Sequence, residues 1–191
     1  SVGQNIGERG LRSRGGAFRN VRAEVLSAHL MQEILKRNPA VQAADVEDVI
    51  WGCVMQTLEQ GFNIARNAAL LAGLPQTVSG QTVNRLCGSS MTAIHAAVGS
   101  IKAGVGDIFI AGGVESMTRA PWVTLRPDEP FPRSVPETAD STIGWRFTNT
   151  ALPHEWAISM GQTAEVVAKQ YHISREDQDT FALESQRRAA E

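Results

Sequence analysis

The segment with the clearest chemical potential surrounds Cys87, where residues 84–93 read NRLCGSSMTA. It places a cysteine where a short strand is expected to pass into a helix. A helix N-terminus presents unpaired N–H groups and a partial positive charge, which favour a thiolate over a thiol. The thiolate is the nucleophilic form of cysteine. On these features alone, a catalytic nucleophile and a small buried thiol fit the segment equally well.

The other side chains of catalytic type are better interpreted as structural. Cys53 lies in a short apolar run, 49–54, where a cysteine usually packs rather than reacts. The four histidines are His29, His95, His154 and His172. His95 lies two turns further along the helix expected after Cys87, and about 12 Å of helical rise exceeds hydrogen-bond reach. The sequence therefore offers no obvious base for Cys87.

Hydrophobic periodicity predicts alternating helices and strands in the first part of the chain. Helices are expected over 25–35, 63–73 and 88–103, ended respectively by Asn38-Pro39, by Gly73 with Pro75, and by Gly104. Strands are expected over 49–54, 82–83 and 108–111. This alternation is typical of βαβ units with a mostly parallel sheet, which is an α/β fold.

The composition changes after Arg119. Six of the eight prolines lie between residues 121 and 153, which is typical of a functional loop, an insertion or a linker. Helical signal returns over 160–171 and again from Ser174, where residues 174–177 form a capping box. The sequence stops at Glu191 within this helical pattern, so we expect the chain to be incomplete.

Composition excludes several classes of function. A net charge of −2 implies no overall attraction to nucleic acid or an anionic membrane. Five arginines lie close together near the N-terminus: Arg9, Arg12, Arg14, Arg19 and Arg22. They could form an anion-binding arm, but a solvated N-terminal segment is favoured because no aromatic residues are interleaved among them. Two cysteines without a spaced Cys/His pattern give no metal site and no disulfide framework. No apolar run could span a membrane or serve as a signal peptide, so a cytoplasmic location is expected.

The surroundings of Cys87 carry a family resemblance. Residues 83–97, reading VNRLCGSSMTAIHAA, closely resemble the nucleophile segment of thiolases, in particular the 3-ketoacyl-CoA thiolases of fatty-acid oxidation. Six further blocks agree in the correct order: RGGAFRN at 14–20, WGCV at 51–54, QGFNIARN at 60–67, AGGVESM at 111–117, SMGQTAE at 159–165 and ISREDQD at 173–179. The chain therefore resembles the N-terminal part of a 3-ketoacyl-CoA thiolase, an acetyl-CoA acyltransferase.

This resemblance implies both a fold and a reaction. Residues 1–117 would form the N-terminal half of a layered α/β/α thiolase fold, and residues 118–191 would begin the loop domain that covers coenzyme A. Cys87 would attack the keto carbonyl of a 3-ketoacyl-CoA, release acetyl-CoA and hold an acyl-thioester that a second CoA removes. Met160 matches a methionine lining the acyl and pantetheine pocket, although it also fits a core methionine. Coenzyme A is a substrate, no cofactor or metal is implied, and a homodimer or homotetramer is expected.

Two departures from the family limit the expected activity. Residues 4–11 are polar where the family has an apolar strand, so one central strand is expected to be missing. The family's second half supplies a histidine in a Gly-His-Pro motif and a second cysteine in a Cys-x-Gly-x-Gly motif, and neither motif occurs here. A nucleophile without its base loses orders of magnitude in rate. We also expect the chain alone to expose a large apolar patch and to self-associate.

Alternative functions remain open at this point. One is a non-catalytic acyl-CoA-binding or assembly module, and another is a cysteine hydrolase that uses a local histidine. Ketoacyl synthases share the cysteine at a helix start, but the surroundings at Asn84-Arg85 and 159–161 resemble thiolases more closely. The pathway is open too, because residues 142–147 resemble thiolases of aromatic degradation.

Overall fold

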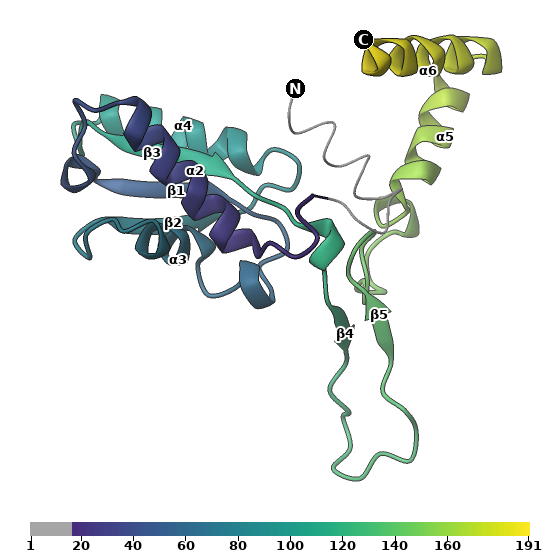
Figure 1. Ribbon diagram of the computed structural model, residues 1–191. Helices are drawn as coiled ribbons and strands as arrows, with labels where there is room; N and C mark the ends of the chain where they lie inside the picture. The colour runs from purple at the N-terminus through teal and green to yellow at the C-terminus, as the bar shows by residue number, and fades with distance from the viewer. Residues whose placement is uncertain (1–16) are drawn as a thin grey trace. The chain divides into compact units, whose positions relative to one another are not determined.

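The computed structural model describes residues 17–191, which form two compact units, 17–121 and 122–191 (Figure 1). The prediction that one central strand is missing concerns residues 4–11, which lie outside the described part of the chain, as do Arg9, Arg12 and Arg14 of the arginine cluster. Among the residues described, no helix is both long enough and apolar enough to cross a membrane.

The first unit is built on a three-stranded parallel sheet in the order β2-β1-β3. The strands are β1 (Asp48–Gly52), β2 (Ser79–Val83) and β3 (Phe109–Gly113). Gly52 at the end of β1 is in register with Val83 on one side and Gly113 on the other, so the three strands end together. The carboxyl ends of parallel strands are where such folds build their sites.

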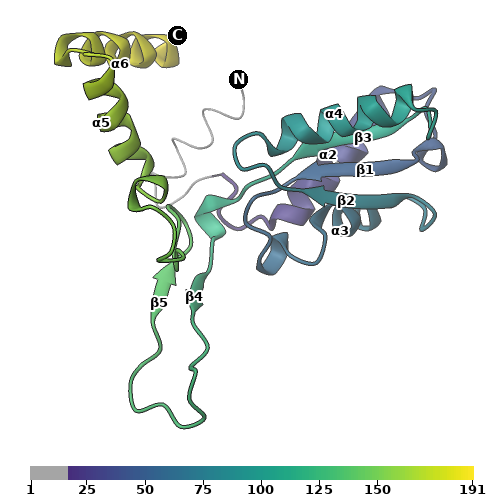
Figure 2. The same ribbon diagram turned by 180° about the vertical axis from the view of Figure 1, so that it is seen from behind.

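Helices cover both faces of this sheet. Helices α2 (Ala23–Arg37) and α3 (Ile64–Leu71) pack on one face, and α4 (Ser89–Lys102) packs on the other (Figures 1 and 2). Met31 and Ile64 join Val49 in the larger core, while Ala93 and Ala97 of α4 contact Ile50 in the smaller one. The alternating in-and-out pattern of β1 places Val49 and Ile50 on opposite faces. The layered α/β/α arrangement expected from the sequence is confirmed.

Apolar side chains are left exposed on both outer layers of this unit. On α4, four large apolar residues recur at helical spacing on the face away from the sheet: Met91, Ile94, Val98 and Ile101. On α2, the exposed ones include Val25, Leu30 and Ile34. These faces agree with the exposed apolar patch expected from the sequence.

The second unit carries the proline-rich segment and two helices. Strands β4 (Trp122–Thr124) and β5 (Thr138–Asp140) form a short antiparallel pair that the sequence reasoning had not predicted. Helix α5 (Met160–Gln170) follows, then α6 (Arg175–Ala190). The capping box before α6 is confirmed, since Ser174 Oγ accepts from the Asp177 N–H at 3.1 Å and the Asp177 carboxylate accepts from the Ser174 N–H. Short 3₁₀ helices complete the chain at Ala43–Asp45, Leu58–Gln60, Met117–Arg119 and His154–Trp156.

Candidate active site at the start of helix α4

Close packing of α4 against the strand ends defines the site. A Cβ atom added to Gly52 would lie 2.5 Å from the Ser90 nitrogen and 2.6 Å from the Ser89 carbonyl carbon. Gly113 lies equally close, and an added Cβ there would meet the Ser90 hydroxyl and the Gly52 carbonyl oxygen. The first turn of α4 therefore rests directly on the ends of β1 and β3, because both strands end in glycine.

Cys87 lies on the tight turn that leads into this helix. It is exposed and stands two residues before Ser89, the first residue of α4, with Gly88 as the N-cap. The preceding residue, Leu86, has a φ of 49°, in the left-handed region that ordinary side chains rarely adopt. Such a conformation costs on the order of 1–3 kcal/mol and persists only where neighbouring groups hold it, typically at functional sites.

Two side chains hold the backbone of this turn. The Asn84 carboxamide oxygen accepts from the Leu86 N–H at 2.9 Å. The Ser89 hydroxyl accepts from the Arg85 N–H at 2.9 Å and donates to the Leu86 carbonyl at 2.6 Å. The peptide groups on both sides of Leu86 are therefore bonded by side chains of the turn itself.

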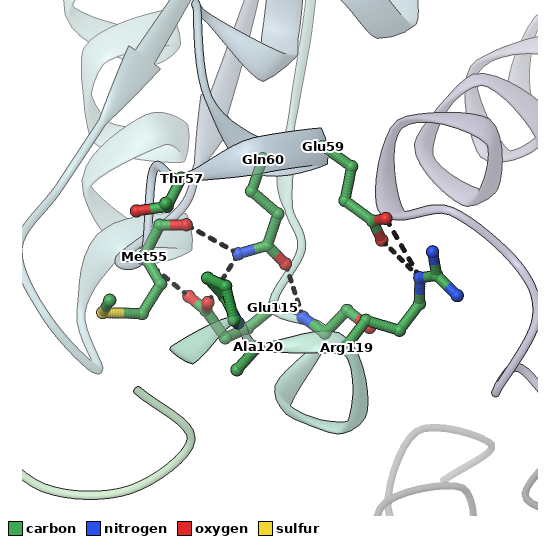
Figure 3. A pocket seen from close by; sticks show the side chains of 9 residues that line it. Met55, Thr57, Glu59, Gln60, Glu115, Arg119 and Ala120 are labelled. Carbon is green, nitrogen blue, oxygen red and sulfur yellow. Dashed lines mark hydrogen bonds and ion pairs between the residues drawn. The ribbon is translucent and has the colours of Figure 1, made fainter. Parts of the chain in front are cut away.

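A second network braces the loop after β1, next to Asn84. The Glu115 carboxylate accepts from the Val54 N–H at 2.9 Å and from the Gln60 amide at 2.7 Å. The Gln60 side chain also donates to the Met55 carbonyl and accepts from the Ser116 N–H (Figure 3). This network joins the loop after β1 to the loop after β3.

An ion pair lies beside the same network. The Arg119 guanidinium donates to both carboxylate oxygens of Glu59, at 2.8 and 3.0 Å (Figure 3). Glu59 also accepts from the Ala23 N–H at the start of α2. Burial acts to raise the pKa of Glu59, but the bonds from Arg119 and Ala23 outweigh it and hold that pKa below its ordinary value. The small pocket that these residues line holds none of the site residues predicted from the sequence.

Cys53 is structural, as the sequence suggested. Its side chain is 1% exposed and belongs to the larger core, although it lies one residue beyond β1 rather than within the strand. Burial raises the pKa of the Cys53 thiol from 9.0 to about 12, and the negative charge of Glu115 adds to the rise. Cys53 therefore stays protonated at neutral pH and is a poor nucleophile.

The structure pairs neither histidine of the first unit with Cys87. His29 and His95 are exposed on α2 and α4, and within residues 17–121 neither forms a hydrogen bond with Cys87. Met160 is the first residue of α5, in the second unit, and its side chain is 79% exposed. Among the described residues, no group of three or more His, Cys, Asp or Glu side chains could hold a metal ion.

Comparison with known proteins identifies the family. The sequence profile described as the thiolase N-terminal domain matches residues 9–191. The chain belongs to the thiolase family. It is 52% identical over 180 residues to a 3-ketoacyl-CoA thiolase of Colwellia psychrerythraea, covering 94% of this chain and 42% of that protein. It is 53% identical over 177 residues to a 3-oxoadipyl-CoA/3-oxo-5,6-dehydrosuberyl-CoA thiolase of Escherichia coli, covering 92% of this chain and 44% of that protein.

A solved structure agrees with the family assignment. The acetyl-CoA acetyltransferase of Bacillus anthracis superposes with a TM-score of 0.75 at 38% identity, over 88% of this chain and 41% of that one. The chain has the N-terminal part of the thiolase fold. It spans about two fifths of the length of these thiolases.

The polar side chains that support the turn before α4 are not among the site residues predicted from the sequence. Asn84 lies in the segment that resembles the thiolase nucleophile segment, and Glu115 and Gln60 lie in two of the other matching blocks. A usable signal was present for Asn84, because asparagine two residues before a turn residue readily accepts from its N–H. No local signal marks Glu115 and Gln60, since their bonds join residues about 55 positions apart.

Proposed function

We propose that this chain supplies the nucleophile of a thiolase-type acyl transfer. The Cys87 thiolate attacks the C3 carbonyl of a 3-ketoacyl-CoA, and the bond between C2 and C3 breaks. The departing carbanion takes up a proton to become acetyl-CoA, which leaves the shortened acyl group as a thioester on Cys87. A second CoA thiolate then attacks this thioester, releasing the shortened acyl-CoA and restoring the free thiol.

One observation carries this proposal: of the two cysteines, only Cys87 is exposed, on a strained turn that enters α4. The positive end of a helix can stabilise the anion that forms during attack. The family relationship supports the substrate class, because the related thiolases act on 3-ketoacyl-CoA or 3-oxoadipyl-CoA, as their names state. Both are 3-oxoacyl thioesters, and β-oxidation and aromatic degradation both produce this group.

The wider assignments belong to the same proposal. Residues 1–117 would be the N-terminal half of the thiolase core and residues 118–191 the start of the CoA-covering loop domain, with Met160 beside the acyl or pantetheine chain. The base that activates Cys87 and the acid that protonates the C2 carbanion are assigned to groups outside this sequence. A homo-oligomer and a cytoplasmic location follow from family likeness alone.

The half-reaction tests the role of Cys87 without requiring the acid that protonates the C2 carbanion, and a mildly alkaline assay supplies the thiolate that the base would otherwise generate. Acetyl-CoA plus the Cys87 thiol should give acetyl-Cys87 plus free CoA, and peptide mass mapping should locate the acetyl group. Cys87→Ser should abolish the thioester, which is cleaved by hydroxylamine, whereas the matched variant Cys53→Ala should retain it. Thioester formation on Cys53, or equal labelling of both cysteines, would contradict the proposal.

The same experiment separates the alternatives. A non-catalytic acyl-CoA-binding module predicts saturable binding of acyl-CoA, for example by calorimetry, with no acetyl transfer to Cys87. A cysteine hydrolase predicts steady release of acetate that is lost when one of the four histidines is replaced. Acetyl transfer without acetate release favours the thiolase assignment.

A further inference from the structure

The left-handed conformation of Leu86 destabilises the turn that carries Cys87. Its φ of 49° is unfavourable for a branched side chain, and the side chain itself is 67% exposed, so packing contributes little to holding it. Hydrogen bonds must therefore stabilise the conformation that places Cys87 before the helix.

The Asn84 side chain forms hydrogen bonds both within the turn and outside it. Its carboxamide oxygen accepts from the Leu86 N–H at 2.9 Å, and its amide nitrogen donates to the Val54 carbonyl at 3.2 Å. The Ser89 hydroxyl, by contrast, bonds only within the turn, to Arg85 and Leu86. Asn84 thus joins the strained residue to the loop that follows β1.

The Val54 peptide is a firm anchor for this contact. Its N–H donates to the Glu115 carboxylate at 2.9 Å while its carbonyl accepts from Asn84. Glu115 is in turn held by the Gln60 amide at 2.7 Å. A continuous set of hydrogen bonds therefore runs from the loop after β3, through the loop after β1, to the turn that carries Cys87.

We propose that Asn84 is a positioning residue for Cys87, acting by locking Leu86 in its left-handed conformation and tying the turn to Val54. This inference rests on the proposed role of Cys87 as the nucleophile. Without Asn84 the Leu86 peptide loses its acceptor, the turn relaxes, and the thiol no longer stays at the positive end of α4. The acyl-transfer step should slow, while binding of CoA should not weaken.

The chain offers a well-matched control in Gln81. Gln81 lies within β2, and its side-chain amide donates to the Asp48 carboxylate at 2.7 Å, at the start of β1, whereas Asn84 follows β2 and bonds to Val54 beyond the end of β1. Gln81→Ala therefore removes one interstrand amide bond without touching the turn. Asn84→Asp is the second control, and it is read by Leu86 exchange alone: it keeps the acceptor for the Leu86 N–H, loses the donor to Val54 and adds a negative charge that would itself change the Cys87 rates.

Three measurements on the 191-residue chain test the proposal: hydrogen exchange of the Leu86 N–H, the rate of acetyl transfer from acetyl-CoA, and the rate of Cys87 alkylation by iodoacetamide. Asn84→Ala should speed Leu86 exchange and lower the maximal acetyl-transfer rate by about fivefold to tenfold, the worth of one hydrogen bond. The acetyl-CoA concentration at half-maximal rate should stay within about twofold, since that factor is under 0.5 kcal/mol. Asn84→Asp should keep the Leu86 N–H protected from exchange. Adding Leu86→Gly to Asn84→Ala should restore at least half of the acetyl-transfer rate that Asn84→Ala loses, because glycine adopts positive φ freely.

The outcomes distinguish this proposal from the function on which it rests. If Asn84→Ala matches Gln81→Ala in Leu86 exchange and in both Cys87 rates, the positioning role is wrong, whatever the chain does with acetyl-CoA. If the unmodified chain forms no acetyl-Cys87, the proposed function falls. The exchange and alkylation rates then still decide the positioning role, with slower alkylation in Asn84→Ala supporting it and an unchanged rate overturning it.

Discussion

Replacing Gly52 by alanine should displace the nucleophile helix. The added Cβ would lie 2.5 Å from the Ser90 nitrogen, and ordinary contact begins at 3.4 Å. The obstacle is helix backbone rather than a flexible side chain, so the first turn of α4 must withdraw by about 1 Å. Overpacking of this kind costs about 1–3 kcal/mol of stability.

The effect on chemistry should exceed the effect on folding. A 1 Å misplacement of a reacting group can cost about a hundredfold in rate. Gly52→Ala should therefore reduce acetylation of Cys87 by up to about two orders of magnitude, in a chain that still unfolds cooperatively. Urea titration followed by far-UV circular dichroism gives the stability, and peptide mass mapping gives the acetylation rate.

Gly99→Ala is a control that should change stability in the opposite direction. Gly99 lies within the same helix, and an added Cβ would meet nothing within 4 Å. Gly99→Ala should raise stability by about 0.5–1 kcal/mol, because alanine favours the helix over the unfolded chain, and should leave acetylation unchanged. Wild-type stability and wild-type acetylation in Gly52→Ala would refute the claim that α4 rests directly on β1.

Three further predictions concern the framework around the site. Ser27→Ala leaves the buried Trp51 indole N–H without its 3.1 Å acceptor and should cost about 1–3 kcal/mol in urea unfolding. The folded chain keeps the Cys53 proton up to about pH 12, whereas the unfolded thiol ionises near pH 9.0. The free energy of unfolding should therefore fall as pH rises above 9.0, by up to about 1.4 kcal/mol per pH unit, and Cys53→Ala should remove that slope. Glu59, whose pKa is lowered, stabilises the folded chain at neutral pH, and this stabilisation is lost as pH falls through the folded pKa of Glu59. Arg119→Gln should therefore lower the midpoint of urea unfolding at neutral pH, and the difference in midpoint between the variant and the wild type should become smaller in acid.

Stretches with a periodic apolar pattern and a clear terminating residue predicted the fold well. The apolar spacing before Asn38-Pro39 predicted α2, which ends at Arg37, and the small-residue run before Gly104 predicted α4, which ends at Lys102. These elements agree because local propensity, capping and burial favour the same structure. The β4–β5 pair escaped prediction because each strand has only three residues and no alternating pattern can be recognised over that length.

The site was predictable only in part, because some of its contacts are local in the sequence and others join distant segments. Cys87 could be located from the change of strand into helix and from the family resemblance. The left-handed Leu86 could not, since leucine carries no preference for that conformation. The Glu115 and Gln60 contacts depend on three strands ending in register, which is a property of the assembled sheet and of no single segment.

The position of Cys87 ultimately depends on small residues as much as on polar ones. Ala93 and Ala97 face the sheet from α4, are almost fully buried and contact Ile50, and Gly52 offers the Ser89–Ser90 backbone a strand end without a side chain. Larger residues at these positions would lift α4 from the sheet and carry the turn away from Asn84 and its anchor at Val54. The glycine and alanine pattern therefore sets how closely the helix approaches, and the Asn84 bonds set how the turn is oriented once it is there. Variants of the two kinds should consequently differ: packing changes should lower stability and acyl transfer together, whereas Asn84→Ala should lower acyl transfer with a much smaller loss of stability.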